Sequence, residues 1–378
     1  MIDTKSFFSH LNASGVDFYS GVPDSLLKNF CAYLADHTDA KHHIIAANEG
    51  NALSLGIGYH LATNKIPLIY MQNSGLGNIV NPLISLADKE VYSIPMLLMI
   101  GWRGEPGVKD EPQHIKQGRI TLNMLDVMEV QYEVLTPDMS DEVANKIINK
   151  AIRETKKTNS PYALVVKKNS FSEYKLKKEL VDQYSVSRED AIKLLIDKIE
   201  DEAVVVSTTG VASRELFEYR DELSGGHKKD FLTVGGMGHA NQVALSIAIQ
   251  EPNRPVYCFD GDGALLMHMG SLAINASLKC RNFKHIVFNN GVHDSVGGQP
   301  TVAFDMDVTG IAASAGYDWT RSVSSVDDIS SAIGELKEIH GTGFLEIRVN
   351  KGFRKNLGRP TTSPKENKKS MMDFISKC

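Results

Sequence analysis

Two short polar motifs in the second half of the chain contain residue types that bind metal ions and phosphate groups. Asp260-Gly261-Asp262-Gly263 follows an apolar segment predicted to be a strand, and Asn289-Asn290-Gly291 follows the next predicted strand. Carboxylate and amide oxygens suit Mg²⁺, which also binds phosphate oxygens. Glycines let the backbone approach a phosphate, and the N–H groups at the start of a helix attract an anion. The motifs therefore predict a metal-bridged diphosphate site, the alternative being two tight turns with an aspartate cap.

The elements around these motifs are repeated once, at an offset of 188 residues. Pro67–Met71 precedes Pro255–Phe259 by that offset, and Leu97–Ile100 precedes His285–Phe288. In each half a small-residue helix, an apolar strand, a glycine-bearing turn, a second helix and a second apolar strand follow one another. Any two α/β domains share part of this pattern, but the ungapped spacing favours a duplication.

Apolar strands that alternate with helices predict an α/β fold in which a parallel sheet is covered on both faces. We expect two duplicated, doubly wound parallel-sheet domains at residues 1–170 and 187–378, joined by a polar linker at 171–186. No apolar run approaches the ~18 residues needed to span a membrane. The chain does not start like a signal peptide, and its four scattered cysteines fit a reducing compartment. We expect a cytoplasmic protein, and its net charge of −5 gives no argument for a nucleic-acid partner.

The two motifs together resemble the cofactor-binding motif of the thiamine diphosphate-dependent decarboxylases, and the resemblance covers nearly the whole chain. It implies that Asp262, the side chain of Asn290 and the carbonyl of Val292 hold Mg²⁺ beside the diphosphate. The family usually has serine where this chain has Ala264, so one hydroxyl contact is missing. Thr208-Thr209-Gly210 resembles the family's diphosphate-binding turn and can compensate.

Further segments resemble the parts of the family that bind the pyrimidine ring of the cofactor. The resemblance implies that Glu49 binds the aminopyrimidine and donates a proton to it, which leads to the cofactor ylide that attacks a 2-oxo acid. Gly235-Gly236-Met237-Gly238 resembles the turn whose bulky residue, here Met237, bends the cofactor while neighbouring carbonyls bind its amino group. Taken alone, Glu49 would be interpreted as a helix-cap acid and Met237 as a core residue. The same glycines lack the full spacing of a dinucleotide loop, which disfavours a nicotinamide oxidoreductase.

Decarboxylation also needs groups that carry protons at the working pH. Asp24, in Gly21-Val22-Pro23-Asp24, matches an early catalytic aspartate of the family. His293 lies three residues after Asn290, and His114 lies in a loop that follows a predicted strand. A lone histidine in a loop is usually a surface residue, but both positions follow strand ends at the expected cleft.

The length of the chain leaves no room for the middle domain that most relatives carry. Chains with two halves resemble the phosphonopyruvate and sulfopyruvate decarboxylases, and Gly101–His114, Asn290–Thr301 and Leu357–Pro360 favour the former. The resemblance implies non-oxidative conversion of 3-phosphonopyruvate to phosphonoacetaldehyde and CO2 in phosphonate biosynthesis. A phosphonate carries nearly two negative charges and attracts cationic and N–H donors. The candidate donors are Arg103, Lys109, Ser295 and Arg359.

Two alternatives remain at this point. One is a sulfopyruvate decarboxylase, and the other is a binding protein that keeps the fold but has lost catalysis, which the presence of Glu49, Asp262 and Asn290 disfavours. In the related enzymes the glutamate-bearing half of one subunit faces the diphosphate-binding half of another. The resemblance therefore implies a homo-oligomer, at least a dimer, with shared active sites and a small anionic 2-oxo acid as substrate.

Overall fold

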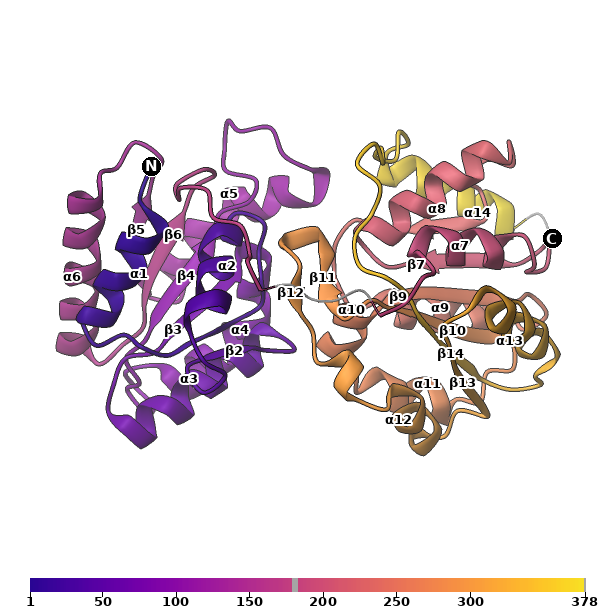
Figure 1. Cartoon of the computed structure of the whole chain (residues 1–378), viewed down its shortest axis with the longest axis horizontal. Helices are drawn as coiled ribbons and strands as arrows, with labels where there is room; N and C mark the ends of the chain where they lie inside the picture. The colour runs from indigo at the N-terminus through magenta and orange to yellow at the C-terminus, as the bar shows by residue number, and fades with distance from the viewer. Residues whose placement is uncertain (179–182, 377–378) are drawn as a thin grey trace. The chain divides into compact units, whose positions relative to one another are not determined.

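The computed structural model describes residues 1–178 and 183–376, which divide into two compact units. Unit 1 is Met1–Glu179 with Val296–Gln299, and unit 2 is Leu180–Ser295 with Pro300–Cys378. Figure 1 shows a sheet with helices in each unit. Part of the predicted linker, residues 179–182, lies outside the described residues, and so does Cys378.

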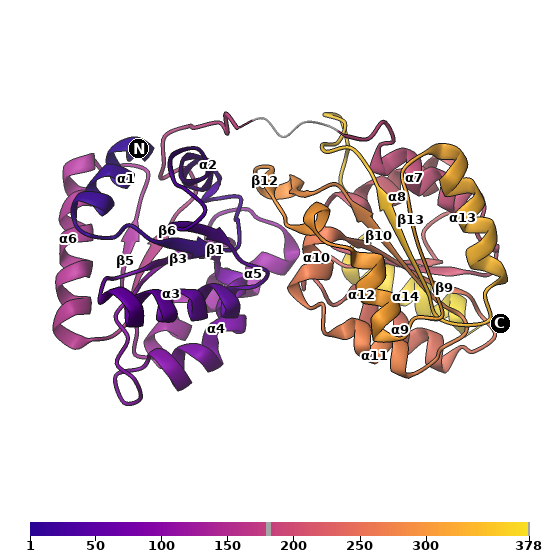
Figure 2. The same ribbon diagram turned by 60° about the horizontal axis from the view of Figure 1, so that its bottom comes forward.

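Unit 1 contains a six-stranded sheet in which every pair of neighbours is parallel. Its strands, in spatial order, are β2 (His43–Ile45), β1 (Tyr19–Gly21), β3 (Leu68–Gln72), β4 (Leu97–Gly101), β6 (Tyr162–Val166) and β5 (Gln131–Leu135). One face is covered by α1 (Thr4–Ala13), α2 (Lys28–His37) and α6 (Asp141–Thr158). The other face is covered by α3 (Glu49–Thr63), α4 (Leu76–Pro82) and α5 (Pro112–Val127), and Figure 2 shows α2 and α3 on opposite sides of the strands.

Unit 2 contains a second parallel sheet of six strands. Its strands, in spatial order, are β8 (Asp230–Leu232), β7 (Val204–Ser207), β9 (Val256–Gly261), β10 (Phe283–Asn289), β14 (Gly343–Arg348) and β13 (Trp319–Val323). One face packs against α7 (Arg188–Ile196), α8 (Val211–Glu222) and α13 (Val326–Glu338). The other packs against α9 (Ala240–Gln250), α10 (Asp262–Met267), α11 (Ser271–Ser277), α12 (Val308–Ala315) and α14 (Pro364–Ile375). The loop after β10 includes the short strands β11 (Val292–His293) and β12 (Gln299–Pro300).

The two sheets have the same topology. Numbered from the first strand of its own unit, each sheet reads 2-1-3-4-6-5. This agreement confirms the predicted pair of duplicated, doubly wound domains. In both sheets the strand order reverses between the first and third strands, and in folds of this kind ligands bind beyond the carboxyl ends of the strands at that point. Ligand sites are therefore expected at the carboxyl ends of β1 and β3, and of β7 and β9.

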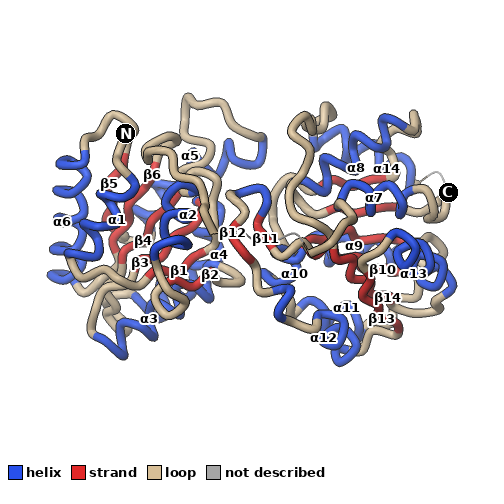
Figure 3. The backbone as a smooth tube through the Cα atoms, in the orientation of Figure 1, coloured by secondary structure: helices blue, strands red, loops and turns tan. Residues whose placement is uncertain are grey.

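The central strands are buried because helices cover both of their faces. Every residue of β4 and of β6 is buried, and both strands are nearly continuous runs of apolar residues. Figure 3 shows the strands, in red, lying between the helices of each unit. Such runs are typical of parallel sheets with two covered faces. No helix within the described ranges has the length and apolar composition needed to cross a membrane.

Candidate functional site

Glu49 lies at the first residue of α3, next to the turn that follows β3. Asn48 caps the helix through its side chain, which accepts a hydrogen bond from the backbone N–H of Asn51 at 2.9 Å. The Glu49 side chain is buried, and its Oε2 accepts a hydrogen bond from Asn78 Nδ2 at 2.6 Å. A Cβ on Gly75 would lie 2.5 Å from Glu49 Oε1, so only glycine leaves room for the carboxylate there.

Asp24 lies at the switch point of unit 1, beyond the end of β1. Its Oδ1 accepts a hydrogen bond from Gln72 Nε2 at 2.7 Å, and its Oδ2 accepts one from the backbone N–H of Leu26 at 2.9 Å. The carboxylate packs against the α-carbon of Gly101, at the end of β4. Burial raises the pKa of Asp24 above its ordinary value. A buried acid with a raised pKa is suited to transferring protons near neutral pH.

The loop between β4 and α5 is held by Arg103. Its Nε and Nη2 donate to the two carboxylate oxygens of Asp110 at 2.8 and 2.5 Å, and its Nη1 donates to Ser25 Oγ at 2.8 Å. This guanidinium, predicted to bind the phosphonate, is therefore engaged within unit 1. Lys109, on the same loop, is exposed. His114 is buried in the first turn of α5.

Asn73 ties the ends of β3 and β4 together. Its side chain donates to the carbonyl of Arg103 and to Thr121 Oγ1, each at 2.8 Å, and accepts a hydrogen bond from the N–H of Arg103 at 3.2 Å. Asn73 is almost fully buried. It was not among the predicted site residues, although a polar residue just after an apolar strand is the signal that could have identified it.

At the switch point of unit 2, the turn after β7 lies beside the end of β9. The N–H of Thr208 donates to the carbonyl of Phe259 at 2.7 Å, and Gly210, with φ of 101°, caps α8. The Oγ1 atom of Thr208 is buried and has no hydrogen-bond partner in the part of the chain that the structure describes. An unsatisfied buried hydroxyl is costly, and an oxygen of a bound diphosphate would satisfy it. Thr209 is partly exposed next to it.

Asp262 and Asn290 directly follow two neighbouring strands, β9 and β10. Gly261 pairs with Phe288 in the β9–β10 register, so the next residues of both strands emerge at one edge of the sheet. Thr301 joins the two turns: its Oγ1 donates to Asp262 Oδ2 at 2.5 Å, and its N–H donates to the carbonyl of Gly291 at 2.8 Å. Thr301 was not predicted as a site residue.

The chemistry of these side chains fits a divalent cation. Asp262 and Asn290 are both buried, and burial raises the pKa of Asp262 to about 7. A bound Mg²⁺ would offset the cost of burying this charge, and both side chains offer the hard oxygen atoms that Mg²⁺ prefers. Val292, whose carbonyl is the third predicted ligand, is buried in the same turn and donates its N–H to Asn290 Oδ1 at 3.2 Å.

The ring of His293 lies against the first turn of α10. A Cβ on Gly263 would lie 2.9 Å from His293 Cε1, so this glycine makes the contact possible. Burial lowers the pKa of His293 to about 4. The imidazole is therefore neutral near pH 7, so one ring nitrogen can donate a hydrogen bond and the other can accept one. Ser295, two residues further on, is exposed.

The predicted wedge turn also lies against α10. Gly238 has φ of 85°, and a Cβ there would lie 2.8 Å from the carbonyl oxygen of Ala264. Gly235 and Met237, in the same turn, are both partly exposed. The structure therefore brings together the wedge turn and the Asp262 turn within unit 2.

Other predicted residues lie apart from these clusters. Arg359 is exposed in the segment after β14. The adjacent Gly358 is bound to α8, because its carbonyl accepts a hydrogen bond from Arg214 Nε at 2.6 Å. Glu49, Asp24, Arg103, Lys109 and His114 belong to unit 1, whereas the remaining predicted site residues belong to unit 2.

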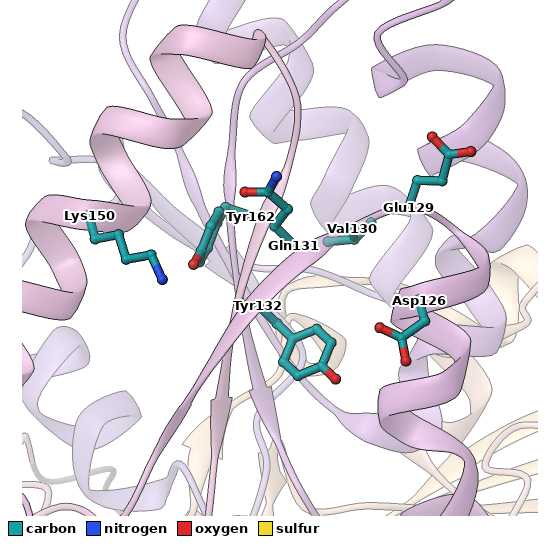
Figure 4. Close-up of a pocket in the computed structure, with 7 residues that line it drawn as sticks. All are labelled: Asp126, Glu129, Val130, Gln131, Tyr132, Lys150 and Tyr162. Carbon is teal, nitrogen blue, oxygen red and sulfur yellow. The ribbon is translucent and has the colours of Figure 1, made fainter.

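A pocket of about 400 Å³ (Figure 4) lies at the end of the unit 1 sheet that is opposite to Asp24 and Glu49. It is lined by residues at the end of α5 and at the starts of β5 and β6, among them Asp126, Gln131 and Tyr162. These are the amino ends of parallel strands, whereas Asp24 and Glu49 lie beyond the carboxyl ends. The pocket contains none of the predicted site residues.

Comparisons with known proteins agree with these observations. Residues 4–127 match the family described as thiamine pyrophosphate enzyme, N-terminal TPP binding domain, and residues 219–347 match the corresponding C-terminal TPP binding domain. The chain is 33% identical over 395 residues to a phosphonopyruvate decarboxylase from Streptomyces viridochromogenes, covering 100% of this chain and 96% of that protein.

Two other relatives also match over nearly their whole length. A phosphonopyruvate decarboxylase from Streptomyces hygroscopicus is 32% identical over 393 residues, with 100% of this chain and 94% of the relative covered. A sulfopyruvate decarboxylase from Methanosarcina acetivorans is 24% identical over 388 residues, with 97% and 95% covered.

The contact between Gly75 and Glu49 generates a first prediction. Gly75→Ala should displace the Glu49 carboxylate and lower kcat/KM by about 100-fold, because small misplacements of a reacting group are costly. Gly77→Ala is the matched control, since a Cβ there meets nothing within 4 Å. Steady-state kinetics and thermal unfolding should be measured for both variants. Equal activity in the two would mean that the position of Glu49 does not limit the reaction.

Proposed function

The chain belongs to the thiamine pyrophosphate-dependent decarboxylases, and on that premise we propose that it converts 3-phosphonopyruvate to phosphonoacetaldehyde and carbon dioxide. The observation that carries the proposal is the similarity to phosphonopyruvate decarboxylases along the full chain, at 33% identity. The sulfopyruvate decarboxylase of Methanosarcina acetivorans matches over a similar length at 24% identity. Glu49, Asp262 and Asn290 are all present and buried, which supports an active enzyme rather than a binding protein.

Unit 2 holds the diphosphate end of the cofactor in this proposal. Asp262, Asn290 and the carbonyl of Val292 bind Mg²⁺, and Thr208 and Thr209 donate hydroxyl groups to the diphosphate. The first N–H groups of α8 and α10, at Gly210 and in the turn from Gly261 to Ala264, add further donors. Met237 would contact the cofactor, and the carbonyl of Gly235 would accept a hydrogen bond from it.

When bound, thiamine diphosphate supplies the nucleophilic carbon and the electron sink on which decarboxylation depends. Glu49 holds and returns a proton at the pyrimidine ring, with Asn78 fixing its carboxylate. Asp24 carries protons in the later steps, since burial raises its pKa above the ordinary carboxyl value. His293 is proposed as a second proton carrier because its ring lies against the first turn of α10, beside the Asp262 turn. His114 is a third proton carrier, placed by the first turn of α5.

The phosphonate needs donors that can reach an anion in the open part of the site. We propose Lys109, Ser295 and Arg359, which are all exposed, as these donors. Arg103 is bound to Asp110, so it contributes by holding the loop that carries Lys109, or by exchanging Asp110 for the phosphonate. Pyruvate would leave such donors unpaired, which is the physical reason for discrimination against it.

A second copy of the chain completes the assembly that we propose. α3 and the equivalent helix α9 consist mostly of apolar and small residues, and helices of that kind are normally buried. Leu55 and Leu61 of α3 and Ile249 of α9 are nevertheless exposed in the single chain. A homo-oligomer, at least a dimer, would cover them and bring unit 1 of one copy to unit 2 of another.

We place the enzyme in the cytoplasm, since Cys31, Cys258 and Cys280 are free thiols.

The substrate is tested by comparing three 2-oxo acids under one set of conditions. Phosphonopyruvate should give phosphonoacetaldehyde and CO2 in equal amounts, with a kcat/KM at least about 100-fold above that of pyruvate. Sulfopyruvate carries one charge fewer and should react more slowly. Lys109→Ala and Arg359→Ala should raise KM for phosphonopyruvate but not for pyruvate, with Lys89→Ala, an exposed lysine paired with Glu129, as control. Faster turnover of sulfopyruvate would refute the proposed substrate.

Glu49→Gln tests the proton transfer at the pyrimidine ring. Glutamine keeps the shape of the side chain but cannot supply the proton, so kcat should fall by roughly 10²- to 10⁴-fold. Circular dichroism and cofactor binding should stay close to those of the wild type. A rise in KM with an unchanged kcat would mean that Glu49 contributes only to binding.

Mixed oligomers test whether active sites are shared between copies. Co-expressed Glu49→Gln and Asp262→Ala chains should recover about a quarter of the wild-type activity, because half of the dimers are hybrids with one intact site. The control pair, Glu49→Gln with Asp24→Asn, changes only unit 1 and should not recover activity. A wild-type chain that is fully active as a monomer would refute the shared site.

A further inference from the structure

Asp294 accepts hydrogen bonds from three segments that are far apart in the sequence. Its Oδ2 accepts from Asn290 Nδ2 at 2.6 Å and from Arg188 Nη1 at 3.2 Å, and its Oδ1 accepts from the N–H of Gly352 at 3.0 Å. The side chain is only 10% exposed. All four residues belong to unit 2. Neither the sequence motifs nor the comparisons assign a role to Asp294 or Arg188.

The bond to Asp294 determines which end of the Asn290 amide is available. An amide has a donor nitrogen and an acceptor oxygen, whereas an ionised carboxylate only accepts hydrogen bonds. Asp294 therefore holds Nδ2 of Asn290 on its own side. Oδ1 of Asn290 is turned away from Asp294 and accepts a hydrogen bond from the N–H of Val292 at 3.2 Å. Only this oxygen can bind a metal ion, so a flipped amide would remove a ligand.

Arg188 holds Asp294 in place. It is the first residue of α7, and its guanidinium also donates to the two carboxylate oxygens of Glu215, in α8, at 2.8 and 3.3 Å. The Arg188 and Glu215 side chains are 9% and 2% exposed, so the pair is fixed by burial. The cluster of Arg188, Glu215 and Asp294 carries one positive and two negative charges. Asp294, which carries part of this surplus negative charge, is hydrogen-bonded directly to Asn290. Negative charge at this position favours a cation beside Asn290.

We propose that Asp294 is a positioning residue that fixes the amide oxygen of Asn290 toward Mg²⁺, and that Arg188 orients Asp294 for this purpose. The inference rests on the proposed function, because Mg²⁺ is part of the cofactor site described above. Groups that orient metal ligands commonly change metal affinity by about 10- to 100-fold when they are removed. A role in binding the anionic substrate does not fit a carboxylate that already accepts three hydrogen bonds.

The test measures cofactor binding rather than activity. Mg²⁺ is titrated into the full-length protein at a fixed concentration of thiamine diphosphate, and the bound cofactor is measured after equilibrium dialysis. Asp294→Asn should raise the Mg²⁺ concentration at half-saturation by about 10- to 100-fold. At saturating Mg²⁺, KM for the substrate should stay close to that of the wild type.

Asp318→Asn is the matched control. Asp318, also in unit 2, accepts hydrogen bonds from the N–H and the hydroxyl of Thr342, each at 2.9 Å, and from Lys279 Nζ at 3.0 Å. It lies near the start of β13, at the other end of the sheet from Asn290. Its substitution should lower thermal stability without changing the Mg²⁺ requirement. Equal changes in Mg²⁺ requirement for the two variants would overturn the proposal.

An exchange of the two side chains provides a rescue. Asn290→Asp alone places two carboxylates in contact and should weaken binding. The double variant Asn290→Asp/Asp294→Asn restores an amide–carboxylate pair and needs no amide orientation, so it should bind Mg²⁺ more tightly than either single variant. The double variant also tests the role of Asp294 if the single variant Asp294→Asn does not fold.

Different results would refute this inference and the proposed function. An Asp294→Asn variant within twofold of the wild type, or a double variant no better than the single ones, would refute the role of Asp294 alone. A wild-type protein that binds thiamine diphosphate without any dependence on Mg²⁺ would refute the proposed cofactor site, and the inference with it.

Discussion

The candidate cofactor site of unit 2 depends on the parallel pairing of β9 with β10. Gly261 lies opposite Phe288 in this register, so Asp262 and Asn290 leave the sheet at the same edge. A slip of one residue would turn the side chains of one strand to the opposite face. The register is held by buried apolar side chains on both faces and by Thr301, which bridges the two turns. The chemistry is therefore a consequence of how two strands align.

Three glycines also shape the candidate sites, because neighbouring polar groups occupy the space that a Cβ would need. The carboxylate of Glu49 lies against Gly75, the ring of His293 lies against Gly263, and the carbonyl of Ala264 lies against Gly238. In the first two cases a larger residue would collide with a side chain that the proposed reaction uses, and in the third it would separate the wedge turn from α10. These glycines are needed for close approach, and only Gly238 of the three also has a positive φ.

The two units share one topology but differ in what they place at the switch point. After β3 the chain forms the turn that contacts Glu49, and after β9 it forms the turn that carries Asp262. Unit 1 thus presents buried acids, among them Asp24, whose pKa is raised by burial. Unit 2 presents an oxygen-rich turn and an unsatisfied hydroxyl at Thr208. The two units therefore have equivalent sheets, and the different residues at their strand ends give the units different roles.

Local patterns in the amino-acid sequence were enough to predict the fold class and the location of the main motifs. Strand and helix periodicity is local, and the repeat at 188 residues carries the same strand order into both halves, as the two sheets confirm. The positions of Asp262 and Asn290 at strand ends follow from that local pattern. The partners of the charged side chains were decided only by the tertiary structure. Arg103 pairs with Asp110, and Arg188 reaches Asp294 across 106 positions, because such contacts depend on how loops and helix ends converge in space, which no local pattern encodes.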